Sequence, residues 1–258
     1  EGVGPGGDSA LLGQRVAIFS GQGGLAEWGC FAAERCVILP KGVGFVPAAG
    51  LLVGHGTAHL ALAHRARLAR GETLAVLGAA GGAGLAAVEI GRRMGAHVVA
   101  CARGAERLEV ARAAGADTLI DTAETPDLKQ ALRALGGVDV VYDAVGGPAT
   151  EAALRACKPE ARLVVIGFAS GSVGHLPANH LMVRNVDAIG VDWGAYLAFR
   201  PAVLRESLAT LMGWHAAGAV APRIGHVLPF ESALEGLDLL RTRRATGKIA
   251  ITIAPEAG

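Results

Sequence analysis

The segment TLAVLGAAGGAGLAAVEIGRRM, residues 73–94, decides the fold class of this chain. Its first five residues form a short apolar run of the kind found in buried strands, and residues 82–94 are rich in helix-forming residues. The glycine-rich turn GAAGGAG, residues 78–84, joins the two. A strand, a glycine-rich turn and a helix in this order are typical of the first unit of a dinucleotide-binding domain.

The alternation of apolar runs and helical segments continues to about residue 191. Such an alternation predicts successive βαβ units, with a parallel sheet covered by helices on both faces. The fold class that we expect is therefore α/β, with a doubly wound six-stranded parallel sheet. The expected strands are 73–77, 97–101, 118–120, 138–142, 162–166 and 188–191, and the helices between them are 82–94, 105–114, 126–135 and 148–157.

The segments on either side of this region have a different pattern. The first fifty residues contain glycine-rich turns and two short strands, at 15–18 and 36–39, which indicate part of a separate β-rich domain. After the sixth strand we expect helices at 201–217 and 231–241 and a last strand at 248–253.

The glycine-rich turn has the residues that a bound pyrophosphate needs. Gly81 lets the phosphates approach the backbone, Gly84 lets the helix pack closely on the strand, and the helix N-terminus offers unpaired N–H groups. Ala79 replaces the first glycine of the usual GxGxxG pattern, so the motif is weaker than the full form. The alternative is a glycine turn with a structural role only. The residues that we expect to contact the cofactor here are Ala80, Gly81, Gly82, Ala83 and Gly84.

The sequence after the second strand favours NADPH over NADH. An NAD enzyme usually places an acidic residue there to bind the ribose hydroxyls, but none stands between Val98 and Ala105. The sequence is instead CARGAER, whose Arg103 and Arg107 can pair with a 2′-phosphate. A charge-assisted contact of about 1.5 to 3 kcal/mol gives a preference of about tenfold to a hundredfold. The alternative is that both arginines are solvated surface charges.

Composition points to a protein that acts on small molecules. The 24 Lys and Arg residues nearly balance the 23 Asp and Glu residues, so no net field attracts nucleic acid or an anionic membrane. The four cysteines form no CxxC pair and indicate reduced thiols in a cytoplasmic protein. An apolar stretch at 42–63 is about long enough to span a bilayer, but Pro47 and several glycines favour a buried segment of a soluble fold.

Several motifs, in this order, resemble those of one family. The whole chain is similar to the zinc-independent quinone oxidoreductases, the zeta-crystallin-like branch of the medium-chain dehydrogenase/reductase family. The motifs are GQRVAIFSGQGGLAEW (13–28), GTAHLAL (56–62), the glycine turn and its helix, VDVVYDAVGG (138–147), LVVIGFASG (163–171), GVDWGAY (190–196) and RRATGKI (243–249).

The resemblance implies a division into domains and a cofactor site. Residues 1–53 are expected to be part of a GroES-like catalytic domain, 54–195 an NADPH-binding Rossmann domain, and 196–258 helices and a strand that return to the catalytic domain. Gly146, Gly167 and Phe168 are expected near the nicotinamide and its ribose. Thr57 is expected to approach from a hinge helix, and Arg244 matches a position near the cofactor. The alternatives are that Phe168 is a core residue and that Arg244 caps the last helix.

The expected reaction is hydride transfer from NADPH to a quinone or an α,β-unsaturated carbonyl compound, without zinc, in a homodimer paired through the sixth strand. No catalytic residue can be assigned, because Tyr142 and Tyr196, the two tyrosines considered as general acids, are expected to have structural roles. His55 and His59 share a helix face, but no HExxH glutamate accompanies them, so we expect no metal.

Two alternatives to this reaction stay open. Family members carry several dozen residues before the point that matches Glu1, and these complete the substrate cleft, so part of the cleft is expected to be missing here. An enoyl-thioester reductase and a truncated, non-catalytic NADPH-binding protein therefore remain alternatives.

Overall fold

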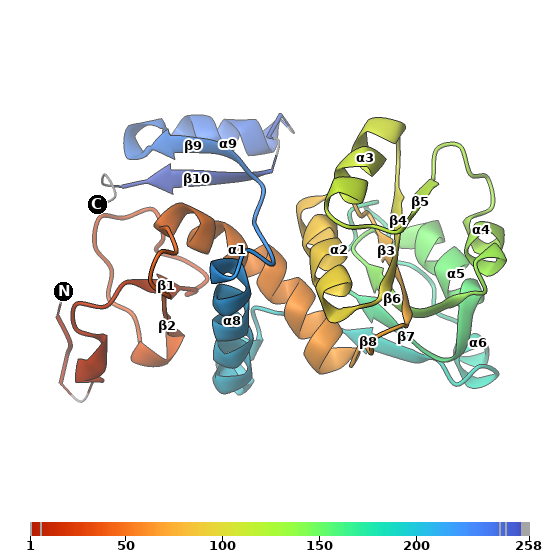
Figure 1. Ribbon diagram of the computed structural model, residues 1–258, viewed down its shortest axis with the longest axis horizontal. Helices are drawn as coiled ribbons and strands as arrows, with labels where there is room; N and C mark the ends of the chain where they lie inside the picture. Colours follow the sequence, from red (N-terminus) through yellow and green to blue (C-terminus); the bar gives the residue numbers. More distant parts are fainter. Residues whose placement is uncertain (1, 6, 243, 246, 254–258) are drawn as a thin grey trace. The chain divides into compact units, whose positions relative to one another are not determined.

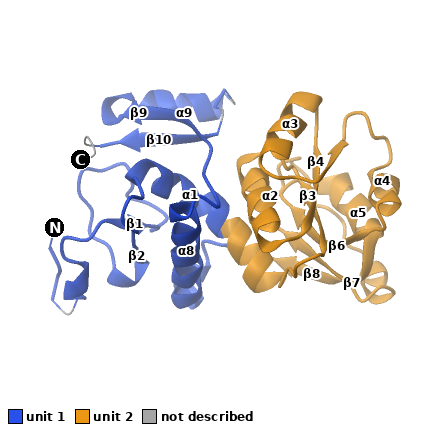
Figure 2. Ribbon diagram, viewed as in Figure 1, with its two compact units in different colours: residues 1–56, 193–258 blue, residues 57–192 orange. Residues whose placement is uncertain are grey.

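The computed structural model describes residues 2–5, 7–242, 244–245 and 247–253. The chain forms two compact units (Figure 2). One comprises residues 57–192, and the other comprises residues 1–56 together with 193–258. The units meet in the chain at 56/57 and 192/193, where the sequence led us to expect boundaries near 54 and 195.

The unit of residues 57–192 is built on a six-stranded parallel sheet with the order β5-β4-β3-β6-β7-β8 (Figure 1). The chain starts in the middle of the sheet at β3, adds two strands on one side, and then returns to add three on the other. This is the doubly wound order, and it confirms the expected fold class. The strands are β3 (Thr73–Leu77), β4 (His97–Ala102), β5 (Thr118–Asp121), β6 (Val138–Asp143), β7 (Cys157–Val165) and β8 (Asp187–Gly190).

Helices cover both faces of this sheet (Figure 1). The helix α2 packs on β3 and β4, whereas α5 packs on β6 and β7. The helix α4 starts two residues later than expected, because the Asp127 carboxylate accepts a hydrogen bond from the Gln130 N–H (2.9 Å) and caps it there. The helical segments are the end of α1 (Phe45–His59), its π-helical continuation η3 (Leu60–Arg65), α2 (Gly82–Met94), α3 (Ala105–Ala113), α4 (Leu128–Ala134), α5 (Gly147–Ala156) and α6 (Ala178–Met182).

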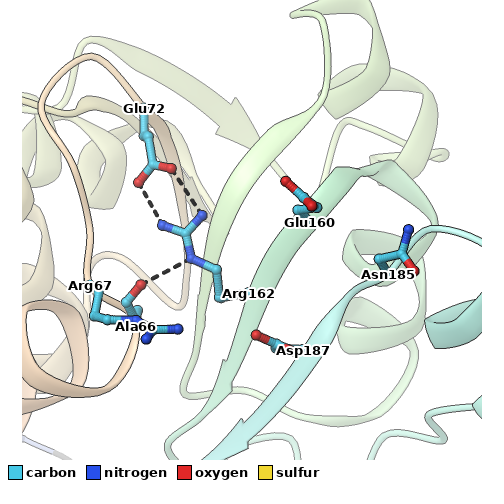
Figure 3. Close-up of a pocket in the computed structure, with 7 residues that line it drawn as sticks. All are labelled: Ala66, Arg67, Glu72, Glu160, Arg162, Asn185 and Asp187. Atoms are coloured by element: carbon cyan, nitrogen blue, oxygen red, sulfur yellow. Dashed lines mark hydrogen bonds and ion pairs between the residues drawn. The ribbon is translucent and has the colours of Figure 1, made fainter.

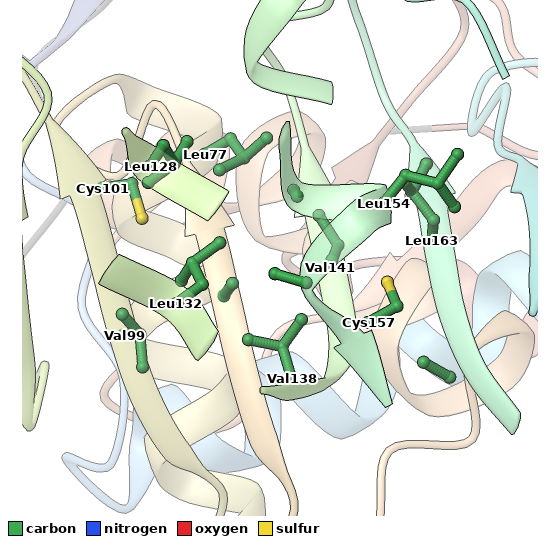
Figure 4. Packing of buried hydrophobic residues seen from close by; sticks show 14 of the residues in the cluster. Leu77, Val99, Cys101, Leu128, Leu132, Val138, Val141, Leu154, Cys157 and Leu163 are labelled. Carbon is green, nitrogen blue, oxygen red and sulfur yellow. The ribbon is translucent and has the colours of Figure 1, made fainter. Parts of the chain in front are cut away.

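A continuous apolar core lies between the sheet and the helices α4 and α5 (Figure 4). Leu132 of α4 is fully buried against it, and so is Leu163 of β7. Each buried side chain of this size contributes about 1.5 to 3 kcal/mol to stability through the surface it removes from water. The core therefore fixes the sheet whose strand ends carry the candidate site.

The described residues of the other unit contain one strand more than the sequence led us to expect. Its strands β1 (Val16–Ile18) and β2 (Cys36–Ile38) form an antiparallel pair, and β9 (Ile224–Pro229) and β10 (Lys248–Thr252) form a parallel pair. We did not predict β9, because its glycine, histidine and proline interrupt the apolar pattern. The helical segments are η1 (Ser9–Leu11), η2 (Ala33–Arg35), the first part of α1, α7 (Tyr196–Phe199), α8 (Pro201–Ala216), η4 (Phe230–Ser232) and α9 (Ala233–Arg241).

One helical stretch of the described residues, Phe45–Arg65, is long and apolar enough to cross a membrane by length and composition. Its mean hydropathy is 1.3, and 61% of its most apolar window is buried inside the protein. A buried core helix of a soluble fold passes the same test.

Candidate functional site

The glycine turn joins β3 to α2 in a shape that only small residues allow. At Gly84 a side chain has no room, because a Cβ atom would collide with the carbonyl oxygen of Gly78 and lie 2.8 Å from the Cα atom of Ala79. At Gly81 the space is open, and the nearest atom to a Cβ would be the Gly78 oxygen at 3.4 Å. Gly81 is the N-cap of α2 and offers no capping side chain, so no side-chain cap occupies the first N–H groups of α2, which suit an anion.

This turn lies beside the turn that follows β6. A Cβ atom on Gly78 would lie 2.9 Å from Cγ2 of Val145, so the two turns are in direct contact. The strands β3 and β6 are neighbours, and the chain reverses its direction of winding between them. The carboxyl ends of strands at such a reversal form the usual ligand crevice of doubly wound sheets.

The segment after β7 lies against the turn after β6. Its backbone runs along the turn after β6 through four N–H···O hydrogen bonds. These join Ile166 (2.8 Å) and Gly167 (3.3 Å) to the carbonyl of Asp143, Ala169 to Ala144 (3.1 Å), and Ser170 to Val145 (2.9 Å).

The structure thereby brings Gly146, Gly167 and Phe168 together. A Cβ atom on Gly146 would lie 2.9 Å from the Phe168 ring. Phe168 is 47% exposed, which contradicts the alternative that it is a core residue.

Arg103 lies in the turn between β4 and α3 and Arg107 in the first turn of α3, and both side chains are exposed. Within the part of the chain that the structure describes, neither guanidinium group has an ion-pair or hydrogen-bond partner. The turn itself is held by Asp121, whose Oδ1 accepts hydrogen bonds from the N–H groups of Gly104 (3.0 Å) and Ala123 (2.9 Å). These bonds lower the pKa of the Asp121 carboxyl group. Sequence reasoning missed Asp121, although an acidic residue at the end of the neighbouring strand was a visible signal.

Two expected site residues lie away from these turns in the chain. Thr57 is half-buried in the last turn of α1. Arg244 belongs to the other unit, just beyond α9, where its guanidinium group forms an ion pair with Asp238 (3.0 Å) and donates to the Thr242 hydroxyl (3.0 Å). These contacts join Arg244 to side chains at the end of α9. Contacts of either residue with a cofactor remain predictions.

Other reactive groups of the sheet are buried and inert. Burial raises the pKa of the Cys101 thiol to about 12 and that of the Cys157 thiol to about 12, so both stay protonated at neutral pH. Burial also raises the pKa of Tyr142, which is fully buried in β6. Among the described residues, no group of three or more His, Cys, Asp or Glu side chains could hold a metal ion.

A pocket of about 490 Å³ lies at the opposite edge of the sheet, near the amino ends of β3, β7 and β8 (Figure 3). Within it Arg162 donates two hydrogen bonds to the Glu72 carboxylate (2.9 and 2.6 Å) and a third to the carbonyl oxygen of Ala66 (2.9 Å). The polar groups at its centre therefore satisfy one another, and the pocket is separate from the crevice at the carboxyl ends. Its lining residues are Ala66, Arg67, Glu72, Glu160, Arg162, Asn185 and Asp187.

We expect Glu72→Gln to lower the free energy of unfolding by about 1.5 to 3 kcal/mol at neutral pH, because it removes a charge-assisted bidentate pair. Burial raises the pKa of Glu72, but the hydrogen bonds from Arg162 and from the N–H of Ala69 outweigh this, so the pKa is lowered. The contribution of the pair is therefore complete above the unfolded pKa of about 4.3 and is lost as pH falls through the lower folded pKa.

Urea unfolding at neutral pH and at steps below about pH 4 checks this, since the difference between the two proteins should shrink as the pH falls. The matched control is Glu109→Gln, whose partner Arg112 is 60% exposed and which is itself 64% exposed. That exposed pair should contribute less than about 1 kcal/mol. An equal loss for both substitutions would contradict the prediction.

Comparison with known proteins agrees with this geometry. A family model described as zinc-binding dehydrogenase matches residues 82–211. Quinone oxidoreductase-like protein 2 of Bos taurus is 36% identical over 245 residues, which cover 93% of this chain and 70% of the relative. The quinone oxidoreductase of Thermus thermophilus, solved also with NADPH, matches with a TM-score of 0.81 and 34% identity, over 93% of this chain and 77% of that one.

A longer relative also matches the chain almost from end to end. A mycocerosic acid synthase-like polyketide synthase of Mycolicibacterium smegmatis is 30% identical over 263 residues, which cover 99% of this chain but 12% of the synthase. By contrast, the chain spans 66 to 70% of the length of the quinone oxidoreductase-like relatives that it matches.

The chain belongs to the zinc-binding dehydrogenase family, and within the medium-chain dehydrogenases and reductases it belongs to the quinone oxidoreductase branch. This confirms the family that the motifs indicated and identifies the chain as an oxidoreductase. The name of the family refers to zinc, but the described residues contain no donor set that would fit the ion.

Proposed function

We propose that this chain binds NADPH and transfers its hydride to a quinone or an α,β-unsaturated carbonyl compound, without zinc. The observation that carries the proposal is the cradle at Gly81, where an open backbone and the uncapped start of α2 face the crevice between β3 and β6. Such a cradle fits a pyrophosphate because the N–H groups and the helix dipole favour an anion.

Each part of the cofactor has a set of residues in the proposal. The adenosine 2′-phosphate lies against Arg103 and Arg107, and Arg244 lies near the cofactor. The pyrophosphate lies against Ala80, Gly81, Gly82, Ala83 and Gly84. The nicotinamide end lies against Thr57, Gly146, Gly167 and Phe168. NADPH supplies the hydride, and the chain supplies position and polarity. An acceptor of this kind develops negative charge on oxygen, which hydrogen bonds from the site or from water stabilise.

Selectivity for NADPH tests the cofactor part of the proposal. We expect calorimetry to give tighter binding of NADPH than of NADH, and Arg103→Ala to reduce that preference by about tenfold to a hundredfold. Arg112→Ala is the matched control, because Arg112 is an exposed arginine near the other end of α3. Equal affinities for the two cofactors, or the same loss in the control, would refute the role of Arg103.

The choice of acceptor tests the reaction. The match to a polyketide synthase motivates a second candidate, an enoyl-thioester reductase. NADPH consumption with a benzoquinone but not with a crotonyl thioester supports the quinone reaction, and the reverse result supports the second candidate. NADPH binding without consumption with either acceptor supports the remaining alternative, a truncated, non-catalytic NADPH-binding protein.

We also propose that residues 1–53 and 196–258 are parts of a GroES-like catalytic domain, and that residues 54–195 are the cofactor domain. A cytoplasmic homodimer is part of the same proposal. The position of β8 at the edge of its sheet supports pairing there, since an edge strand has unpaired backbone groups. Light scattering that gave the mass of a monomer would contradict the dimer.

A further inference from the structure

Asp143 is a buried carboxylate at the end of β6 that no part of the proposed function uses directly. It is 1% exposed, and it forms no ion pair with any residue that the structure describes. Burying a carboxylate without a cation is costly unless hydrogen bonds satisfy it. Its partners therefore indicate what the residue does.

All of those partners belong to the turn after β6 or to the helix that follows it. Oδ1 accepts hydrogen bonds from the N–H groups of Val145 (2.9 Å) and Gly146 (2.9 Å). Oδ2 accepts one from the hydroxyl of Thr150, a residue of α5 that is 2% exposed. The Asp143 side chain thus ties the end of β6 to the first turns of α5.

The segment after β7 meets the same two residues, through the backbone of Asp143 and the side chain of Thr150. The backbone carbonyl of Asp143 accepts the N–H groups of Ile166 (2.8 Å) and Gly167 (3.3 Å). A Cβ atom on Gly174 would lie 2.5 Å from Cβ of Thr150 and 2.7 Å from its hydroxyl oxygen, so the segment packs directly on Thr150. Both walls around Gly146 and Phe168 therefore rest on the Asp143–Thr150 pair.

We infer that Asp143 and Thr150 are positioning residues for the nicotinamide end of the crevice. They hold the two segments that carry Gly146, Gly167 and Phe168 at a fixed separation, and they do not touch the cofactor themselves. The turn proposed for the adenosine end is held by a different hydrogen bond, from the Gly104 N–H to the carboxylate of Asp121 at the end of β5. This inference rests on the proposed function, and it predicts that the two ends of the cofactor respond differently to the loss of the pair.

Two ligands distinguish effects at the nicotinamide end of the site from effects at the adenosine end. NADPH reaches both ends, whereas 2′,5′-ADP has only the adenosine end. We expect Thr150→Val, which removes the hydroxyl group but keeps the shape, to weaken NADPH binding by about tenfold, the equivalent of about one hydrogen bond. We expect its affinity for 2′,5′-ADP to stay within about twofold, which is about 0.4 kcal/mol.

Further variants test the pair as a unit. Thr150→Ser should restore NADPH binding, because the hydroxyl group returns, and Asp143→Asn should repeat the loss seen in Thr150→Val. Thr118→Val is the matched control, since Thr118 makes its hydrogen bond to His97 (3.0 Å) at the amino end of β5, away from the crevice. It should change neither affinity.

Calorimetry with both ligands, together with thermal unfolding, decides between the outcomes. Unchanged NADPH binding by a folded Thr150→Val protein would overturn the inference, and so would an equal loss of both ligands, which a merely structural role predicts. If the unsubstituted chain bound neither ligand, the proposed function would fail, and the inference with it.

Discussion

A protein carrying Gly84→Ala is expected to lose both NADPH affinity and stability. Its new methyl group would meet the carbonyl oxygen of Gly78 and the Cα atom of Ala79, which are backbone atoms and cannot rotate away. Forcing the turn apart should lower the free energy of unfolding by about 1 to 3 kcal/mol. The displaced α2 would also lose the bonds that we propose it makes to the pyrophosphate, each worth about tenfold to a hundredfold in affinity.

Gly81→Ala separates the two effects. Gly81 has a φ of −80°, which any residue adopts, and its Cβ would meet no atom closer than 3.4 Å. Stability should therefore fall by less than about 1 kcal/mol. The methyl group would stand where we propose that the phosphates approach, so NADPH affinity should fall about as far as in Gly84→Ala. Urea unfolding and calorimetry measure the two quantities. Normal NADPH affinity in Gly81→Ala would show that the pyrophosphate lies elsewhere.

Leu132→Ala is expected to lower the free energy of unfolding by about 2 to 5 kcal/mol, because it opens a cavity in the core shown in Figure 4. Leu132 is fully buried at the centre of α4, between the sheet and α5. Leu135→Ala is the matched control: the same change at the end of the same helix, at a position 42% exposed. Urea unfolding of both variants checks the prediction, and a similar loss in each would contradict it.

The parallel sheet could be predicted because its strands are buried on both faces and are therefore apolar along their length. The expectation for β7 was too short at its start, since Lys158 and Glu160 interrupt its apolar pattern and Glu160 adopts a φ of 61°. The strand β9 was missed for a related reason: every second residue is exposed, and Gly225 removes a side chain from the pattern. Partly exposed short strands carry little sequence signal.

The two glycine turns of the site could be placed from sequence, because each follows a strand end and needs small residues. The hydrogen bonds that fix them could not, because Asp121 and Thr150 lie 17 and 7 residues from the groups they hold. Only the strand order brings Asp121 beside Gly104, and only the helix α5 brings Thr150 back over Asp143. Whether Arg244 contacts the cofactor remains a prediction for a similar reason, since it lies in the other unit.

The cradle at Gly81 offers main-chain N–H groups rather than side chains. Every amino acid except proline has such a group, so mutation there is limited by the size of the side chain and not by its chemistry. Descendants of one ancestral gene can therefore keep the cradle while their other residues diverge toward different acceptors. The proposed cradle thus limits the size of the residues at its glycines, and the choice of acceptor must depend on other residues.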